Sequence, residues 1–307
     1  MNYYVKMFLR KVVHKYPMFN NSYKVASKIK DTLNIGLSDE EFFKRRYKEN
    51  TGKILNLKFP KTFNEKLLWL QIHDHNPLYT LLSDKLEVKN YVREMIGAEY
   101  VVPLINVWNS ADDIRFENLP DEYVLKCTHD SGTIIVKRKE VNINVRKVRA
   151  RLRHALRRNY YNVGRVWAYK DIKPRIICED LIKTKNGQLP RDYKIFCFNG
   201  EPRFCFVASD RETAPKFDFF DISWKKIPVM QHYPNSNYNI KKPERWEEIL
   251  NFARRLSSGI PQVRVDFYIG ENDSIFFGEM TFCHFSGKEN FVPDEYDEIF
   301  GGYITVI

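Results

Sequence analysis

The sequence predicts an α+β fold, because patterns typical of strands and of helices mix along all 307 residues. In residues 192–210 two strand patterns surround Asn199-Gly200, the strongest short signal for a hairpin. A second hairpin is predicted in residues 264–282, where two apolar runs flank a polar turn. Helical patterns lie between these strands, and hydrophobic residues make up 43% of the chain. This composition is that of a globular protein with a well-formed core.

The expected elements follow one another without an internal repeat or a low-complexity linker. Residues 1–60 are basic and helical in pattern. The helix after them has Thr62 as its N-cap and Glu65 three positions later, which is a capping box. Two further helices are expected at 144–158, where basic residues crowd, and at 243–260. The other expected elements are a helix at 83–97, one bent or two short strands at 99–108, a turn or small helix at 112–120, strands at 122–127, 134–140 and 174–182, and a loop at 128–133.

The net charge of +11, from 50 Lys and Arg against 39 Asp and Glu, favours anionic partners. Nucleotides, acidic glycans, nucleic acid and acidic membranes all fit, and charge alone does not choose among them. The five cysteines show no C-x-x-C spacing, which argues against a zinc site or a disulfide framework. Thiols placed in apolar runs indicate a reducing, cytoplasmic compartment. No apolar run is long enough to span a membrane, and no signal peptide is visible.

Residues 1–16 combine an apolar stripe with basic residues at helical spacing. Such a helix can lie on an anionic membrane, which would place the protein peripherally at the inner face of the membrane. The same pattern also fits an N-terminal helix that docks on its own domain, and the sequence leaves both open.

The strand at 122–127 and the loop after it are suited to phosphate binding. Lys126 lies on the strand, and the loop contains Ser131 and Gly132. A fixed cation beside backbone N–H groups fits a nucleotide polyphosphate, although the same residues also occur in ordinary hairpin turns. Glu179 and Asp180 interrupt an apolar strand and need a partner, which could be a nucleotide or solvent.

Asp192 and Lys194 alternate with apolar residues, so an acid and a base share one face of the predicted strand. An ordinary ion pair would explain them as well as a ligand would.

Two carboxylates interrupt the predicted hairpin at 264–282. A loop centred on residues 271 and 272 would pair Arg264 with Glu279 and Asp266 with Phe277. One face would then carry Arg264, Asp266, Glu279 and Thr281, and the other Val265, Phe267, Phe276 and Met280. Two carboxylates and a hydroxyl can hold Mg²⁺ that also binds nucleotide phosphates. The alternative is a structural network in which Arg264 neutralises both acids.

Taken together, these segments resemble the ATP-grasp superfamily, and most closely its TupA-like members from polysaccharide biosynthesis. The resemblance runs from about residue 62 to the C-terminal region and depends on the order and spacing of several segments. These are FNEKLLWL, SDKLEVKNYV, NLPDEYVLKCTHDSG, PRIICEDLI, DYKIFCFNGEP and RVDFY followed by FFGEMTF. The resemblance implies two α+β subdomains that clasp a nucleotide, with an N-terminal helical extension. The implied division is a basic extension at 1–60, the N-terminal part of the core at 61–123, a lid subdomain at 124–183, and a C-terminal core with the magnesium site at 184–307.

The resemblance also implies ATP and Mg²⁺ as cofactors and gives roles to matching residues. Lys85 and Lys126 would contact the nucleotide phosphates, and Arg264 would stabilise the transferring phosphoryl group. Lys194, with Asp192, would reach the phosphates or the ribose. The implied lid over the phosphates is His129, Ser131, Gly132 and Thr133, and the implied hinge strand at the adenine is Glu179, Asp180, Leu181 and Ile182. The implied metal ligands are Asp266, Glu279 and Thr281, where Thr281 stands in place of the asparagine usual in the superfamily.

The activity implied by the resemblance is ATP-dependent ligation of a carboxylate to an amine through an acyl phosphate. The substrates would be an acidic sugar, such as a uronic acid of a bacterial surface polysaccharide, and an amine or amino acid. A sugar kinase and a glycosyltransferase of the same pathway remain alternatives. Nucleic acid is not expected, because the aromatic residues lie in apolar strand runs and do not alternate with Arg on an exposed sheet. The basic helix at 144–158 is either a solvated face or a docking surface for a polyanionic glycan or an acidic membrane.

Overall fold

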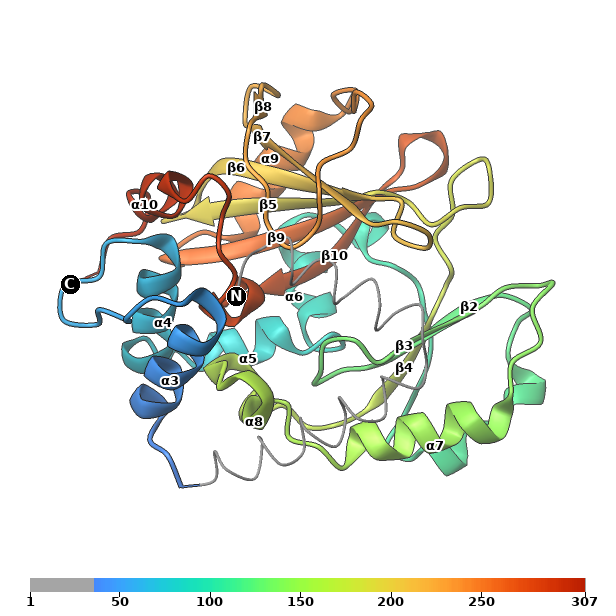
Figure 1. Cartoon of the computed structure of the whole chain (residues 1–307). Coiled ribbons are helices and arrows are strands. Elements are labelled where there is room, and N and C mark those ends of the chain that lie inside the picture. The colour runs from blue at the N-terminus through green and yellow to red at the C-terminus, as the bar shows by residue number, and fades with distance from the viewer. Residues whose placement is uncertain (1–35, 307) are drawn as a thin grey trace.

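The computed structural model describes residues 36–306, which form two antiparallel sheets connected by helices (Figure 1). Within these residues the large sheet has the strand order β10-β9-β5-β6-β7-β8, and the small sheet has the order β1-β4-β2-β3. Figure 1 shows the large sheet in the upper part of the view and the small sheet at the lower right. Helices combined with antiparallel sheets confirm the α+β class.

The large sheet contains both predicted hairpins. Its strands are β5 (Asp192–Phe198), β6 (Glu201–Ser209), β7 (Lys216–Asp221), β8 (Lys226–Ile227), β9 (Gln262–Ile269) and β10 (Ile275–Thr281). The β5–β6 turn has φ of 49° at Asn199 and 83° at Gly200, the left-handed conformation for which Asn-Gly is favoured. Strands β7 and β8 were not predicted, because polar and apolar residues alternate only over residues 216–219 of β7 and Phe220 breaks the pattern.

The predicted register of the second hairpin is wrong. In the structure Glu279 lies opposite Asp266, and Thr281 lies opposite Arg264. The pairing shifts between Phe277 and Glu279, so that β10 has a bulge at Gly278. A Cβ atom at position 278 would lie 3.1 Å from the backbone oxygen of Asp266, which explains why glycine occupies the bulge.

The bulge changes which aromatic residue enters the core. Phe277 lies opposite Phe267 and is buried, whereas Phe276, which was predicted on the core face, lies opposite Tyr268 and is only half-buried. The charged face is unaffected, because the bulge moves Glu279 and Thr281 together into line with Asp266 and Arg264.

Helices cover both faces of the large sheet. On one face α9 (Trp246–Leu256) packs with its apolar side, where the Cys197 thiol lies against the carbonyl of Ala253. On the other face α4 (Phe63–His73) inserts Phe63 against Phe196 of β5, with ring centroids 5.8 Å apart. The capping box at the start of α4 is present as predicted.

Four other helices come from the N-terminal and C-terminal parts of the described chain. They are α3 (Asp39–Thr51), α5 (Leu78–Ser83), α6 (Val88–Met95) and α10 (Glu295–Gly301). The helix predicted at 83–97 therefore begins later, because Asp84 closes α5 and accepts hydrogen bonds from the backbone N–H groups of Leu86 and Glu87.

The small sheet has its own hydrophobic core beneath one helix. The sheet consists of β1 (Leu104–Trp108), β2 (Tyr123–Cys127), β3 (Ile134–Lys137) and β4 (Ile176–Glu179). Helix α7 (Val145–Leu156) covers one face of this sheet, and the short helix α8 (Tyr161–Gly164) follows α7 along the chain. Leu125 and Cys178 face α7, so Lys126 and Glu179 project from the opposite face. The small sheet contains strands from two of the four predicted segments, because β1 lies within residues 61–123 and β4 lies within residues 124–183. The division of the chain into these four segments stays a prediction.

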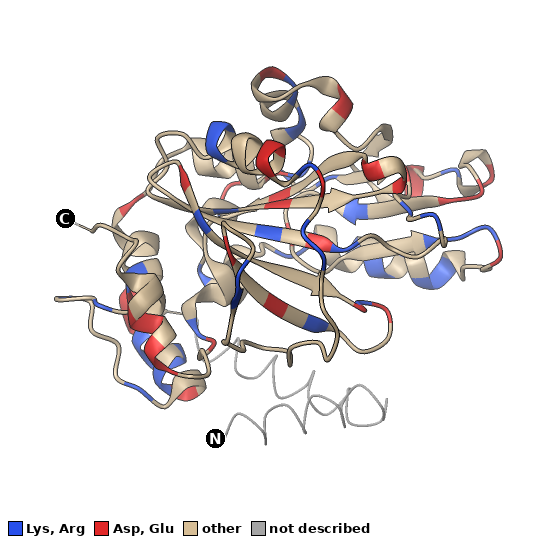
Figure 2. Ribbon diagram, turned by 90° about the horizontal axis from the view of Figure 1, so that it is seen from above, with Lys and Arg blue, Asp and Glu red and all other residues tan. Residues whose placement is uncertain are grey.

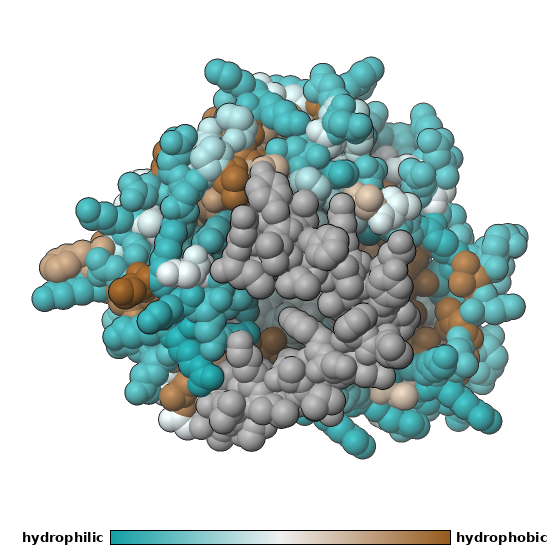
Figure 3. Space-filling view, viewed as in Figure 1, coloured by the Kyte–Doolittle hydropathy of each residue, from teal (hydrophilic) through white to brown (hydrophobic). Residues whose placement is uncertain are grey.

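The visible surface is mainly hydrophilic, and its apolar residues form small spots (Figure 3). The described residues contain no helix that is long and apolar enough to cross a membrane. All five cysteines are buried free thiols, as their positions in apolar runs predicted. The amphipathic pattern at 1–16 lies outside the described residues.

Candidate active site

A cleft opens where the small sheet faces the edge of the large sheet beside α6. Its empty space, including the open mouth, is about 480 Å³. The residues that line it are Lys85, Val88, Lys89, Val101, Val102, Lys126, Ile134, Glu179, Tyr268, Phe277, Gly278 and Glu279. Four of the residues expected to bind the nucleotide or the metal, Lys85, Lys126, Glu179 and Glu279, therefore line one cleft.

Glu179 lies between two lysines at the inner wall of this cleft. Its two carboxylate oxygens lie 2.5 Å from the Nζ atoms of Lys126 and Lys89. Burial alone would raise the pKa of Glu179, but the charges of Lys126 and Lys89 outweigh this effect and lower the pKa below its ordinary value. Glu179 is thus an ionised carboxylate that fixes two cations toward the cleft.

Lys89 is a cleft residue that the sequence analysis missed. Its side chain is buried, donates to the carbonyl of Val102 at 2.9 Å, and has a pKa lowered by burial. The available signal was its position four residues after Lys85, a spacing that places two side chains on the same side of a helix. That spacing is also common among surface lysines, so it could not single Lys89 out.

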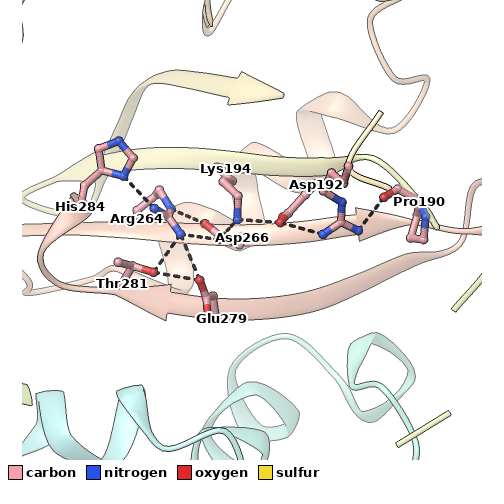
Figure 4. Close-up of polar contacts among 9 residues, drawn as sticks. Pro190, Asp192, Lys194, Arg264, Asp266, Glu279, Thr281 and His284 are labelled. Atoms are coloured by element: carbon pink, nitrogen blue, oxygen red, sulfur yellow. Dashed lines mark hydrogen bonds and ion pairs between the residues drawn. The ribbon is translucent and has the colours of Figure 1, made fainter. Parts of the chain in front are cut away.

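A second row of charges lies on the large sheet, where Figure 4 shows Asp192, Lys194, Asp266 and Arg264 in line. Lys194 lies 2.6 Å from Asp192 and also contacts Asp266. Arg264 donates from Nε and Nη2 to the two oxygens of Asp266, each at 2.7 Å. The side chain of Asp266 is fully buried, and burial raises its pKa while Arg264 and Lys194 oppose the change.

Arg264 also joins Asp266 to the exposed end of the row. Its Nη2 lies 3.1 Å from Glu279 and 3.0 Å from the hydroxyl of Thr281. Burial alone would raise the pKa of Glu279, but Lys194, Arg264 and Lys85 lower it to about 2. The side chain of Glu279 is still 32% exposed, so an ionised carboxylate reaches the cleft.

The three predicted metal ligands are therefore brought together, but Arg264 contacts all of them. This arrangement matches the alternative interpretation, in which Arg264 neutralises both acids. The described residues contain no group of three or more His, Cys, Asp or Glu side chains placed to hold a metal ion. Glu279 and Thr281 nevertheless fit a Mg²⁺ ion that takes its other ligands from phosphates, since Glu279 is ionised and accessible. Asp266 could join them only by giving up a contact to Arg264 or Lys194.

The predicted lid residues lie in the loop between β2 and β3. Ser131 and Gly132 are exposed, and φ at Gly132 is 106°, a conformation that favours glycine. Lys85 donates to the carbonyl of Asp130, and Thr133 donates to the carboxylate of the same residue. The loop is thus tied to one of the predicted phosphate-binding lysines.

His129 does not share this placement. Its side chain is buried, and its Nε2 lies 3.1 Å from the carbonyl oxygen of Ala155 on α7. The expectation that this imidazole closes over the cleft is therefore not supported, because the side chain is directed into the core beneath α7.

The predicted hinge residues connect the two sheets. β4 ends at Glu179, and Asp180 is exposed while its backbone N–H donates to the carbonyl of Pro103. Leu181 and Ile182 are half-buried and lie outside any strand. The position of Glu179–Ile182 at the crossing between the sheets fits a hinge, but the regular strand is shorter than predicted.

Structural comparison gives distant matches. The chain is 13% identical to a Staphylococcus aureus N5-carboxyaminoimidazole synthetase structure, with a TM-score of 0.35, over 66% of this chain and 44% of that one. It is 14% identical to an Aspergillus clavatus N5-carboxyaminoimidazole synthase structure in complex with ADP and an aminoimidazole ribonucleotide, with a TM-score of 0.37, over 67% and 46%. It is 11% identical to the ATP-grasp ligase PsnB complexed with minimal precursor, Mg and ADP, with a TM-score of 0.36, over 71% and 57%.

The chain spans less than half the length of the two synthetase structures. No curated protein matches this sequence. A family model does match it, and the match covers residues 65–305, which is most of the chain and includes both sheets and the cleft. The protein belongs to the TupA-like ATP-grasp family.

Proposed function

We propose that the protein is an ATP- and Mg²⁺-dependent ligase that joins a carboxylate to an amine. The observation that carries this proposal is the meeting of cations and carboxylates in one cleft. Lys85, Lys89 and Lys126 line this cleft with Glu179 and Glu279. Arg264 lies beside the cleft on the large sheet, where it contacts Glu279 at 3.1 Å, and Lys194 contacts Asp266 on the same sheet. Family membership and the ADP and Mg named for PsnB support the same choice.

In the proposed reaction the substrate carboxylate oxygen attacks the γ-phosphorus of ATP, and the bond to the bridging oxygen of ADP breaks. The amine then attacks the carbonyl carbon of the acyl phosphate and loses a proton, and phosphate leaves with the electrons of the C–O bond. Lys85 and Lys126 bind the nucleotide phosphates, and Arg264 faces the negative charge that develops on the transferring group. Mg²⁺ at Glu279 and Thr281, with Asp266, would supply further charge neutralisation for the phosphates.

The finer proposal concerns the substrate. We propose an acidic sugar of a surface polysaccharide as the carboxylate and an amino acid or other amine as the nucleophile. This choice is supported by the TupA-like family and by the net charge of +11, which suits a polyanionic polymer. A cytoplasmic enzyme that contacts the membrane peripherally would meet lipid-linked forms of such a polymer.

The test measures ADP release with ATP and Mg²⁺ across a panel of uronic acids and amino acids. We expect release only when both a carboxylate and an amine are present, and we expect EDTA to abolish it. Asp266→Asn should lower the rate by about 100-fold, because a charge that orients the metal and Arg264 is lost. Asp171→Asn, which changes an exposed carboxylate outside the cleft, should leave the rate unchanged.

Three results would count against parts of the proposal. Full activity of the Asp266→Asn variant would show that Asp266 is not a ligand of the metal ion. ADP release that needs a sugar hydroxyl and no amine would identify a kinase. If no pair of a uronic acid and an amino acid caused ADP release, the protein would not be a ligase for these substrates.

A further inference from the structure

Among the described residues, the guanidinium of Arg264 has one neutral hydrogen-bond partner besides the hydroxyl of Thr281. Its Nη1 lies 2.8 Å from Nδ1 of His284, which follows β10 directly after Cys283. The other side of the imidazole, Nε2, lies 2.8 Å from Oε1 of Gln231. His284 and Gln231 are both buried, and Figure 4 shows His284 on the side of Arg264 away from Glu279.

The chemistry of the neighbours fixes the tautomer of His284. A guanidinium has donors and no acceptor, so Nδ1 must accept the hydrogen bond from Arg264. Nε2 must therefore carry the proton and donate a hydrogen bond to Oε1 of Gln231. The amide of Gln231 cannot be reversed without loss, because its Nε2 donates to the carbonyl of Glu289 at 3.1 Å. The contacts thus select a neutral imidazole protonated at Nε2.

Burial acts in the same direction. It lowers the pKa of His284 well below the ordinary value, and the charges of Arg264 and Lys194 lower it further. A protonated imidazole would place an N–H group against Nη1 of Arg264, where no acceptor would remain.

The backbone that holds His284 is unusual. Phe285, Ser286 and Gly287 follow it with φ values of 48°, 53° and 60°, a left-handed conformation that costs free energy for residues other than glycine. A Cβ atom at Gly287 would lie 2.7 Å from a side-chain carbon of Leu68, so α4 lies tightly against this turn. Strain of this kind persists where surrounding packing determines the conformation, and it is concentrated at functional sites.

Apart from Thr281, the other side chains that accept hydrogen bonds from Arg264 are the carboxylates of Asp266 and Glu279, which would also be ligands of a metal ion. Binding of Mg²⁺ to Asp266 or Glu279 would weaken their contacts with the guanidinium. The Nδ1 contact would persist, because a nitrogen that faces a buried cation is not available to a metal. We infer that His284, held in one tautomer by Gln231, is a positioning residue that keeps Arg264 aimed at the phosphoryl group when the carboxylates bind metal. The inference rests on the proposed function of this same cleft.

No local pattern in the sequence indicates this arrangement. Gln231 and His284 are separated by 53 positions along the chain, and neither lies in a predicted strand or helix. They meet because the segment after β8 and the turn after β10 lie on the same side of the large sheet.

The kinetic test compares two substitutions of His284. His284→Phe keeps an aromatic ring beside Phe196 and Phe206 but removes the acceptor. His284→Asn places an amide oxygen on Cγ, where Nδ1 is attached, and so restores the acceptor. We expect His284→Phe to lower the rate of the first turnover of ADP formation by about tenfold or more, with the KM for ATP changed less than about twofold. His284→Asn should recover most of the rate.

The burst amplitude in the same experiment reports the fraction of active molecules. A full amplitude with a slower rate supports positioning, whereas a reduced amplitude at the wild-type rate indicates only a folding defect and overturns the inference. A wild-type rate in His284→Phe overturns it as well.

A second measurement needs no turnover. Nitrogen-15 NMR of the full chain, labelled at histidine, distinguishes a protonated from an unprotonated ring nitrogen. We expect His284 to stay protonated at Nε2 alone through the range around pH 6.5 in which a free histidine titrates. A wild-type His284 that is protonated at Nδ1 overturns the inference even if no ligase substrate is found.

Discussion

Glu179 illustrates how the meaning of a single residue depends on its neighbours in space. Its sequence context allowed a nucleotide contact or a solvent-exposed strand end. In the structure it is buried and holds Lys89 and Lys126, which come from α6 and β2. A buried ion pair contributes little net stability as a pair, but removing one partner leaves an uncompensated buried charge.

We therefore predict that Glu179→Gln lowers the free energy of unfolding by about 3–5 kcal/mol, because the buried Lys89 loses its counter-ion. Urea unfolding at neutral pH measures this change. The matched control is Asp180→Asn, which alters the neighbouring exposed carboxylate and should change stability by less than about 0.5 kcal/mol. Equal effects of the two substitutions would show that the pair with Lys89 is not buried in solution.

At the scale of the element, contact between α4 and α10 depends on a single glycine. A Cβ atom at Gly301 would lie 2.3 Å from the backbone oxygen of Lys61 and 2.7 Å from the backbone nitrogen of Phe63. The neighbouring atoms are backbone, so they cannot turn aside as a side chain could. Phe63 in turn packs on Phe196 of β5, the strand that carries Asp192 and Lys194.

We predict that Gly301→Ala lowers the free energy of unfolding by about 1–3 kcal/mol through overpacking at the start of α4. Gly302→Ala is the control, since a Cβ atom at Gly302, the residue that follows α10, would lie no closer than 3.2 Å to its nearest neighbour, the backbone oxygen of Ile299. Thermal or urea unfolding of both variants measures the difference. A Gly301→Ala variant as stable as wild type would mean that α10 shifts without cost.

Only some of the basic residues on and beside helix α7 are available to bind a partner molecule, because others already contact groups of the protein. Arg149 donates to the carbonyls of Ala111 and Ile114, Arg153 contacts Asp112, and Arg151 donates to the carbonyl of Gly132 in the lid loop at 2.8 Å. These arginines hold the small sheet and its loop together. The exposed basic residues that remain are Arg146, Lys147, Arg157 and Arg158.

At the scale of the whole molecule, Lys and Arg recur along α7 (Figure 2). If this surface docks a polyanionic glycan, reversing Arg146, Arg157 and Arg158 to Glu should weaken binding of an acidic polysaccharide by more than about tenfold at low salt. The difference should shrink as added salt screens the charges. Fluorescence anisotropy of a labelled polysaccharide measures the affinity, and ADP release from a monomeric substrate should be unchanged.

A matched reversal of Lys58, Lys61 and Lys241, which are exposed on other parts of the molecule, controls for total charge. Equal weakening by both triple variants would show a general charge effect and would remove α7 as a specific docking surface.

The sequence by itself determined features that depend on neighbours in the chain. The capping box of α4 and the Asn199-Gly200 turn form from residues a few positions apart, and both are present. Alternation in β9 and β10 placed Arg264, Asp266 and Glu279 on one face, and this survived the error in register. The family resemblance is confirmed by the family match, and Lys85, Lys126, Glu179 and Glu279 line one cleft.

Only the tertiary structure decided which of these groups act on one another. The bulge at Gly278 depends on close approach to the Asp266 backbone, and the burial of His129 depends on α7. The tautomer of His284 depends on its contacts with Arg264 and Gln231. Each of these is a contact between segments far apart in sequence, where packing and desolvation outweigh local preference. A local pattern can assign a side chain to a face of a strand, but its protonation and its partners are set by the elements that cover that face.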